Sequence, residues 1–503
     1  MRKPPELPEI ADQIGTSDRV GSDHSSGRVG LFDAGREHAC ELLRACQLEP
    51  DLLLDPPRPA PHPAAEWAAS GAMALTGAAE GPPRFASGPL ASVARGASLA
   101  LQSLAGAKRF EGLDAAALLG ERAALSGLTR QGDRSAGGSA RLLATRGGTL
   151  ALNLPREDDW HLVPAWLEAD LPKAAHAVVS ESGRDAAWQQ IATLVASREG
   201  TALVERGRLM GLAIARAHTP PESPPAPCTT FFELQGGTES EPAPDARRLR
   251  LLDLSNLWAG PLATSLLAMS GIEVLKVERP TRPDGARNGA QEGAQQGTRA
   301  FFDLMNGNKL ACALDLRESR DRVFFEQLLE AADIVVESAR PRSLSQLGYD
   351  AGGWVDARAG RIWVSITGYG RTNEWIAFGD DAAIAAGLAW SPAAEQSDPC
   401  FCADAIADPL TGLHVASIVL AHLRQGRGGL FDISLSGIAR RAASAAHEGI
   451  VLPLAHGPKG WSVIEGDRAH PVEGPRARPV RRAAPELAAP SAALLSKWCD
   501  PTC

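Results

Sequence analysis

The chain has 503 residues, enough for two to four domains of ordinary size. Apolar residues make up 44% and charged residues 22%, which permits a large core and excludes disorder throughout. The 60 acidic and 51 basic residues give a net charge of −9, which argues against a nucleic-acid-binding surface over the whole chain. Eight scattered cysteines do not make a disulfide framework.

Membrane and secretion signals are not found along the sequence. The most apolar stretch, Leu254 to Ile272, is interrupted by polar and small residues, so it does not predict a membrane span. Residues 1–30 are polar, predict a loose tail, and lack the apolar run of a signal peptide. We therefore expect a cytoplasmic protein that binds no membrane and no nucleic acid.

Composition divides the chain before any motif is considered. Residues 31–217 are rich in Ala and Leu and mostly helical in pattern. Residues 218–247 are dominated by proline, glycine and acidic residues and predict a linker. Residues 441–503 are rich in Pro, Arg and Ala and are expected to be extended.

Residues 248–440 alternate between strand and helix patterns. Strands are predicted at 248–255, 273–279, 311–316, 334–338 and 361–370. Helices are predicted at 260–271 and 319–333, the second opening on Ser319 as a cap. This alternation is typical of βαβ units, so the predicted fold class is α/β with a parallel sheet.

A weak internal repeat links two distant segments. Residues 70–106 resemble residues 386–426, since both run from a small-residue helix through a proline-containing loop into an Ala-rich helix. The best match sets ASLALQSL at 97–104 against ASIVLAHL at 416–423. We interpret this echo as a degenerate repeat.

Common nucleotide and hydrolase motifs are missing from the sequence. There is no glycine-rich dinucleotide motif after a strand, no P-loop and no nucleophile elbow. Cys400 with Cys402, and Cys499 with Cys503, lack a partner set for zinc, so free thiols are expected. The adjacent Asp380 and Asp381, which follow Gly379, predict a loop or a helix start, and a solvated turn is the alternative interpretation.

The stretch IADPLTG at 406–412 carries the most informative carboxylate. Asp408 precedes Pro409 at the start of a predicted helix, where Asp is a common N-cap and Pro a common first residue. The alternative is a functional carboxylate, ionised at pH 7 because its reference pKa is about 3.9. Such a group attacks a thioester directly and forms a mixed anhydride.

Five ordered blocks resemble the family III coenzyme A transferases, the CaiB/BaiF family. They are DLSNLWAGPLATSLLAMSGIEVLKVERP (253–280), MNGNKLACALDL (305–316), ADIVVESARPRSLSQLGYD (332–350), SITGYGRTNEW (365–375) and IADPLTGLHVASIVLAHLRQGRGGLFDISL (406–435). The resemblance spans these blocks from first to last and implies a Rossmann-like parallel-sheet CoA-binding domain at 248–440. It also implies a smaller α/β domain, which residues at about 141–217 resemble, after a helical N-terminal region.

The resemblance also implies roles for eight residues. Asp408 takes the place of the family's nucleophile, and Trp258 lies at a position close to the thioester. Arg279 and Arg340 match positions that contact CoA, Asn308 and Lys309 match a loop near the adenosine, and Tyr369 and Gly370 match the acyl-pocket loop. Charge-assisted bonds from arginine to phosphate are consistent with these positions.

The resemblance implies CoA transfer between an acyl-CoA and a carboxylic acid, with no cofactor beyond CoA as substrate, in a homodimer. Two departures leave alternatives open. The smaller domain precedes the CoA-binding part here, and the N-terminal half looks like a degenerate copy, with Gly88 or Pro89 near the place of Asp408. The racemase branch has a histidine where this chain has Asp380. A 2-methylacyl-CoA racemase and a non-catalytic CoA-ester-binding subunit therefore remain the alternatives.

Overall fold

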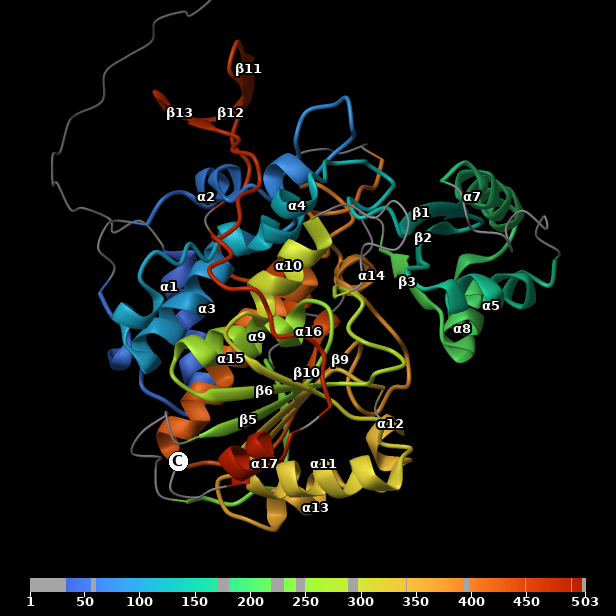
Figure 1. Ribbon diagram of the computed structural model, residues 1–503. Helices are drawn as coiled ribbons and strands as arrows, with labels where there is room; N and C mark the ends of the chain where they lie inside the picture. The colour runs from blue at the N-terminus through green and yellow to red at the C-terminus, as the bar shows by residue number, and fades with distance from the viewer. Residues whose placement is uncertain are drawn as a thin grey trace, which may run out of the picture. The chain divides into compact units, whose positions relative to one another are not determined.

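The computed structural model describes most of the chain (Figure 1). The described residues are 33–55, 60–169, 181–218, 230–240, 249–287, 297–340, 342–392, 398–447, 449–489 and 491–499. The predicted tail at 1–30, most of the predicted linker at 218–247, and Cys503 lie outside these residues.

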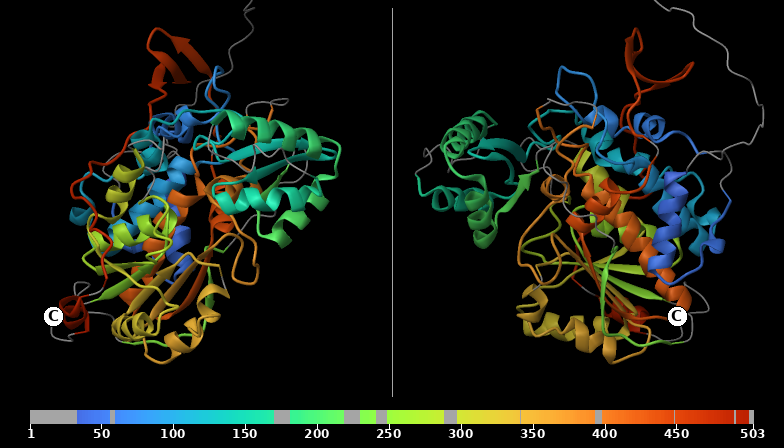
Figure 2. Two further views of the ribbon diagram at one scale, coloured as in Figure 1. Left: turned by 45° about the vertical axis from the view of Figure 1, so that its right-hand side comes forward. Right: turned by 180° about the vertical axis from the view of Figure 1, so that it is seen from behind.

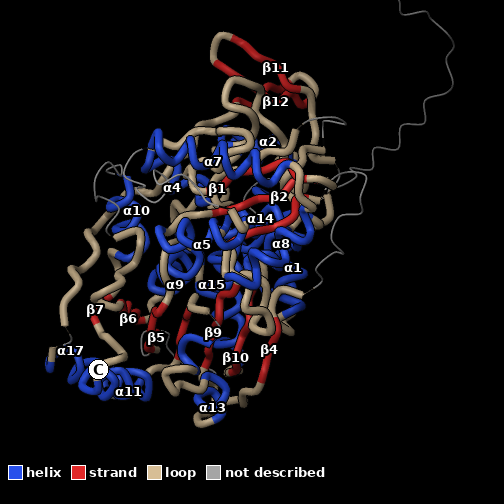
Figure 3. Tube along the Cα trace, turned by 90° about the vertical axis from the view of Figure 1, so that its right-hand side faces the viewer, coloured by secondary structure: helices blue, strands red, loops and turns tan. Residues whose placement is uncertain are grey.

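A seven-stranded sheet forms the centre of the fold. Its strands run in the order β4-β10-β9-β8-β5-β6-β7, with β7 at one edge and β4 at the other (Figure 3). All neighbours pair in parallel except β4, which is antiparallel to β10. The bounds are β4 (Glu233–Gln235), β5 (Arg250–Leu254), β6 (Glu273–Glu278), β7 (Leu310–Ala313), β8 (Ile334–Glu337), β9 (Ile362–Thr367) and β10 (Gly429–Ser434). The predicted α/β class and parallel sheet are confirmed.

Helices cover both faces of this sheet, as its apolar strands require. On one face, Leu251 and Val336 pack into the cluster that contains α9 (Ala259–Met269) and α15 (Ala407–Gln425). On the other, Leu252 and Val335 pack with α11 (Ser319–Ala331), α13 (Ala351–Asp356) and α17 (Ala492–Cys499). The shorter helices of this part are α10 (Gly297–Asn306), α12 (Arg342–Ser345), α14 (Gly379–Ala385) and α16 (Leu435–Ala443).

The N-terminal helices are packed into the same core as the sheet. These are α1 (Ala34–Ala45), α2 (Pro63–Ala69), α3 (Leu90–Ala105) and α4 (Glu121–Ser126). One hydrophobic cluster takes in Leu42 and Leu101 from this region together with Leu413 and Phe431. Figure 2 shows α1 and α3 beside α15, so segments from the two ends of the described chain share one core.

A smaller sheet with its own core follows the N-terminal helices. It consists of β1 (Ala140–Thr145), β2 (Gly148–Asn153) and β3 (Ala213–Ala217), all antiparallel. The helices α5 (Glu157–Leu167), α7 (Glu181–Ala196) and α8 (Gly200–Met210) lie between β2 and β3 in sequence and bury Trp166 against one face. The other face, including Ala151 and Ala215, packs against α14 through Ile384. This region runs from β1 to β3, residues 140–217.

The C-terminal segment has more regular structure than its composition suggests. Three antiparallel strands, β11 (Leu454–Gly457), β12 (Gly460–Glu465) and β13 (Arg468–Pro471), form a third sheet. Gly460, with a φ of 99°, permits the tight turn between the first two. Residues 472–489 run without helix or strand, as expected, before α17 buries Trp498 under the main sheet.

No helix in the described parts of the chain combines the length and apolar character needed to cross a membrane.

Candidate active site

Asp408 lies in the first turn of α15, not at its cap. The cap residue is Ile406, and the Asp408 N–H donates to the carbonyl oxygen of Ala405 at 2.9 Å. The helix therefore begins at Ala407, two residues before the Pro409 expected as its first residue, and the N-cap interpretation of Asp408 is wrong. Ala403 and Ala405, just before it, have φ values of 55° and 44°. Left-handed alanines store backbone strain, which is a common feature of functional loops.

Gly379 holds the backbone of α14 against the Asp408 carboxylate. A β-carbon at Gly379 would lie 2.4 Å from Asp408 Oδ2 and 2.3 Å from the Ala405 carbonyl oxygen, so no side chain fits there. The Gly379 N–H bonds the carboxylate and favours its charged form. The carboxylate thus has a backbone donor beside it.

Three further charged groups surround Asp408. Asp380 is buried, and its Oδ1 accepts the Ala405 N–H at 2.9 Å. Asp404 is fully buried and receives both Nε and Nη2 of Arg122, the former at 2.8 Å from Oδ2. Asp380 and Asp381 lie in the first turn of α14, as the predicted helix start requires. The solvated-turn alternative is wrong, because both side chains are buried.

Burial raises the pKa of Asp408 to about 7, and the neighbouring charges of Asp380 and Asp404 act in the same direction. The Arg122 guanidinium opposes the shift. Burial likewise raises the pKa of Asp380 to about 6. The prediction that Asp408 ionises with its ordinary pKa is therefore not supported by the environment that the fold gives it.

Asp381 ties the smaller sheet to this cluster. Its Oδ1 accepts from Asn153 Nδ2 of β2 and from the Phe378 N–H, both at 3.0 Å. Burial raises the pKa of Asp381 to about 7. Because Asn153 is uncharged, this contact joins α14 to the smaller sheet without neutralising the carboxyl group.

Trp258 and Arg122 lie together at the start of α9. Trp258 is only 1% exposed, packs edge-on against Phe301, and has no partner for its indole N–H among the described residues. The Arg122 guanidinium lies 5.4 Å from the Trp258 ring centroid. The structure thus connects predicted Trp258 to Asp408 through an arginine of the N-terminal half.

The two predicted arginines lie at the surface. Arg279 is exposed and 3.6 Å from Asp315. Arg340 is exposed as a whole. Partial loss of solvent around its guanidinium lowers the pKa of this group, and the like charges of Arg156 and Arg282 lower it further. Arg156 comes from the smaller domain, so positive charges from both domains converge near Arg340, where a polyanion would be favoured.

Asn308 and Lys309 differ in their surroundings. Asn308 is exposed, whereas Lys309 is buried. The Lys309 ammonium bonds Asp253 Oδ2, Asn306 Oδ1, Thr264 Oγ1 and the Pro261 carbonyl oxygen at 2.7–3.0 Å. Its charge is therefore satisfied inside the protein, and a direct phosphate contact would require these bonds to break.

Tyr369 and Gly370 line a cavity of about 290 Å³ at the carboxyl ends of β9 and β10. Trp375, Ser434 and Arg440 also line it. The Arg208 guanidinium of α8 lies 4.8 Å from the Tyr369 ring centroid and 4.2 Å from that of Trp375. The lining is mixed in charge, because Glu233 and Asp432 stand in it beside Arg440, and Asp408 is not among its lining residues.

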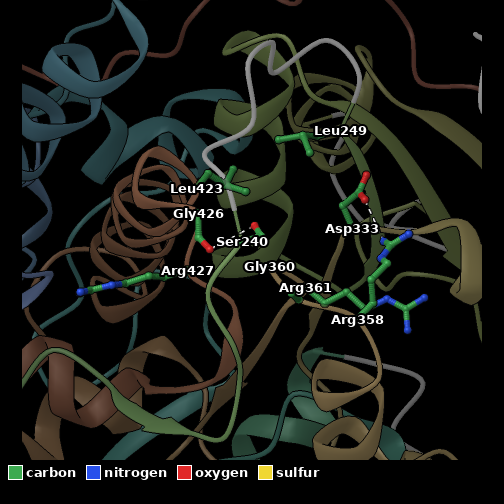
Figure 4. Close-up of a pocket in the computed structure, with 10 residues that line it drawn as sticks. Ser240, Leu249, Asp333, Arg358, Gly360, Arg361, Leu423, Gly426 and Arg427 are labelled. Carbon is green, nitrogen blue, oxygen red and sulfur yellow. Dashed lines mark hydrogen bonds and ion pairs between the residues drawn. The ribbon is translucent and has the colours of Figure 1, made fainter.

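A second cavity, of about 100 Å³, lies at the amino ends of the strands (Figure 4). It is lined by Ser240, Leu249 and an ion pair in which Arg358 Nη2 lies 2.8 Å from Asp333 Oδ1. None of the predicted site residues lines it. Ligands of open α/β sheets bind at the opposite, carboxyl edge.

Metal and thiol chemistry have little support in the described residues. No group of three or more His, Cys, Asp or Glu side chains is placed to hold a metal ion there. Cys400 and Cys402 are free thiols, as predicted, and burial raises the pKa of both.

Sequence reasoning missed Arg122, Arg156 and Arg208. All three come from the N-terminal half, where no motif marks them. The sequence could have indicated only the neighbouring acids. They lie between the last two sequence blocks, just before Asp408: Asp380, Asp381 and Asp404.

Comparison with known proteins places the sheet segment in a family. Residues 247–449 match the sequence model of CoA-transferase family III. The succinyl-CoA:glutarate CoA-transferase of Homo sapiens is 30% identical over 207 residues, which cover 40% of this chain and 46% of that protein. The formyl-CoA:oxalate CoA-transferase of Escherichia coli O6:H1 is 27% identical over 194 residues, which cover 37% of this chain and 46% of that protein.

Among solved structures, a CaiB/BaiF family protein from Brucella suis is 22% identical and covers 45% of this chain and 66% of that one, with a TM-score of 0.37. The chain spans about half the length of the curated relatives it matches. The match at 247–449 contains all the residues that the five sequence blocks singled out, from Trp258 to Asp408. Residues 247–449 of this chain are therefore similar in sequence to CoA-transferase family III.

Proposed function

We propose that the protein moves CoA from an acyl-CoA to a carboxylic acid, with Asp408 as the nucleophile. The observation that carries this proposal is the position of Asp408 within the family segment, against the Gly379 N–H and beside Arg122. The named relatives transfer CoA between acids, which supports the reaction class.

The reaction needs no oxidant and no ATP. The Asp408 carboxylate attacks the thioester carbonyl, the C–S bond breaks, and CoA leaves as a thiolate, which gives an aspartyl mixed anhydride. The thiolate then attacks the aspartyl carbonyl and releases the donor acid, leaving an aspartyl-CoA thioester. The acceptor carboxylate reverses these two steps and departs as its CoA ester.

The surrounding residues have separate roles in this proposal. Arg279 and Arg340 contact CoA phosphates, and Asn308 lies near the adenosine. Lys309 holds the turn before β7 through its buried ammonium instead of binding phosphate itself. Trp258 lies next to the Arg122 guanidinium near the thioester. Water exclusion by the closely packed smaller domain would protect the anhydride from hydrolysis.

Tyr369, Gly370 and Arg440 belong to the acyl and acid pocket in this proposal. The cavity of about 290 Å³ has room for a small organic acid, and the Arg440 guanidinium would bind its carboxylate. Two arginines, Arg208 and Arg440, lie near Tyr369. Their positive charges favour an anionic group there.

The test is covalent trapping combined with substitution. Asp408→Asn should lower turnover by roughly three orders of magnitude or more, because the covalent route is lost. Hydroxylamine added with acyl-CoA should modify Asp408 in the wild type, as read by peptide mass spectrometry, and leave the variant unmodified. Asp381→Asn is the matched control and should retain the adduct. Normal turnover by Asp408→Asn would refute the nucleophile, and CoA binding without any turnover by the wild type would favour a binding subunit.

A second candidate function is favoured by one observation. Asp380 stands where the racemase branch has histidine, and it is buried beside Asp408. The pKa of Asp380 is raised to about 6 and that of Asp408 to about 7. Two acids of matched pKa can exchange an α-proton on a 2-methylacyl-CoA. Deuterium uptake at the α-carbon in deuterated water, without CoA transfer, would support the isomerase over the transferase.

A further inference from the structure

Two parts of the chain repeat one arrangement with a constant offset in sequence. The helices α2 and α14 have the same length, so the distance from Pro63 to Gly379 equals the distance from Ala69 to Ala385. At the same offset, Gly71 and Gly387 both have positive φ, 83° and 94°. The repeat predicted from sequence is therefore visible in the backbone, although its register at the long helices differs slightly from the predicted match.

The long helices repeat as well. Gly96 of α3 faces the Gly35 carbonyl oxygen of α1, and a β-carbon there would lie 2.2 Å away. Gly412 of α15, at the same sequence offset, faces the Ala259 carbonyl oxygen of α9, where a β-carbon would lie 2.8 Å away. Both helix pairs thus cross at a glycine. The helices α2 and α3 correspond to α14 and α15 at one offset, and α1 corresponds to α9 through its contact with this glycine, at a smaller offset.

The two copies meet along α3 and α15. Ser417 Oγ donates to the Ala97 carbonyl oxygen at 2.9 Å. The ring nitrogens His38 Nε2 of α1 and His414 Nε2 of α15 are 2.7 Å apart. The contact is buried, and it lies within one continuous hydrophobic cluster.

Each copy is packed against a small sheet from the other half of the chain. In the C-terminal copy, Asp381 of α14 bonds Asn153 of β2 at 3.0 Å. In the N-terminal copy, α2 packs against β12 and β13, and the Ala68 carbonyl oxygen accepts the Glu473 N–H at 2.9 Å. Both sheets are antiparallel and three-stranded, so the exchange is reciprocal.

The N-terminal copy has no free carboxylate where the other has Asp408. The corresponding residue is Ser92, not Gly88 or Pro89, and its hydroxyl donates to Glu66. Glu66 accepts Arg95 Nε at 2.5 Å, and Arg95 Nη2 donates to Asp33 at 2.6 Å. These groups satisfy one another internally, and the described residues of this half contribute no strand to a parallel sheet.

We propose that residues 33–503 are two copies of one unit folded within a single chain, in which the N-terminal copy has lost its own site and completes the site at Asp408. The N-terminal copy supplies Arg122, which bonds Asp404 and lies against Trp258, and the smaller sheet, which covers α14. Arg122 is a positioning residue. The arrangement rests on the fold alone, whereas its catalytic consequence rests on the proposed function.

The first test measures the mass of the full chain. Light scattering after size exclusion should give the mass of one chain over a wide concentration range, because the surface that a second copy would need is filled by α3. Trapping should yield one adduct per chain. A stable dimer, which the family resemblance alone predicts, would overturn the proposal whether or not the protein proves to be a transferase.

The second test separates positioning from simple packing. Arg122→Met removes the cation that faces Asp408, leaving Asp380 and Asp404 as its charged neighbours, so the pH–activity curve should move to higher pH by about 1 unit. Arg122→Lys should restore most of this shift. Arg95→Met, the matched control, breaks a similar ion-pair cluster in the N-terminal copy and should lower thermal stability without moving the curve.

Carbodiimide modification of Asp408, followed by peptide mass spectrometry against pH, reads the same shift without turnover. If wild-type turnover is absent but this titration shifts in Arg122→Met, the transferase assignment fails and the positioning role stands. An unchanged titration in Arg122→Met would overturn the positioning role.

Discussion

Activity should rise steeply with pH through the neutral range, because only the ionised Asp408 attacks a thioester. The pKa of Asp408 is raised from 3.8 to about 7. About one tenth of the carboxyl groups are then ionised at pH 6 and about nine tenths at pH 8, so kcat/KM should increase roughly tenfold between them. A carboxyl group of ordinary pKa would be fully ionised over that range and give a flat profile.

Asp380→Asn provides the matched perturbation. The asparagine oxygen can still accept the Ala405 N–H, but the like charge beside Asp408 is removed. The pKa of Asp408 should fall by about 1 unit, and the activity curve should move to lower pH by the same amount. The assay is CoA transfer at saturating acid, measured from about pH 5 to about pH 9 on both proteins.

Thermal stability should change in the opposite sense to activity. Because the folded-state pKa values of Asp408 and Asp380 lie above their unfolded values, folding favours the protonated forms. Stability is therefore greatest below about pH 4 for these two groups and declines as pH rises toward about 7. A flat activity profile from pH 5 to pH 9, or an alkaline shift in Asp380→Asn, would refute the argument that burial controls Asp408.

Three further predictions concern single side chains. Arg279→Ala should weaken binding of every CoA ester by about 1.5–3 kcal/mol, measured by calorimetry, and a loss that depends on acyl length would instead place Arg279 in the acyl pocket. Gly379→Ala should abolish turnover, since the new methyl group would overlap the Asp408 carboxylate, while Gly474→Ala, which meets open space, should not. Lys309→Met should lower the free energy of unfolding by about 3–5 kcal/mol, because it leaves a buried carboxylate unpaired, and a purely binding defect in a stable protein would contradict this structural role.

The main sheet could be predicted because its strands are locally distinctive. The strands from β5 to β9 are short segments rich in Val, Ile and Leu or Ala, and the observed strands lie at or close to the positions expected. The amphipathic pattern of 319–333 likewise predicted α11. Such elements depend on neighbours in sequence, which periodicity records.

The site could be predicted only in part, because its electrostatics depend on long-range packing. The blocks indicated Asp408, but the cation beside it, Arg122, comes from α4, 282 residues away from its partner Asp404. Burial of Asp380 requires the smaller sheet to lie on α14, which no local pattern encodes. The start of α15 was misplaced for a similar reason, since the left-handed Ala403 and Ala405 lead the chain into the helix before Asp408, where the cap was expected.

The contact between His38 and His414 has a consequence for how the two copies can diverge. When the starts of α1 and α9 are aligned, His38 corresponds to Ala263, and at the offset of the long helices His414 corresponds to Ser98. This histidine pair therefore occurs once and has no mirrored counterpart. A pair of identical subunits would have to make every such contact twice. Within one chain, a residue change on one side of the contact between α3 and α15 affects that side alone. Each half can therefore specialise, the C-terminal half for catalysis and the N-terminal half for positioning the site.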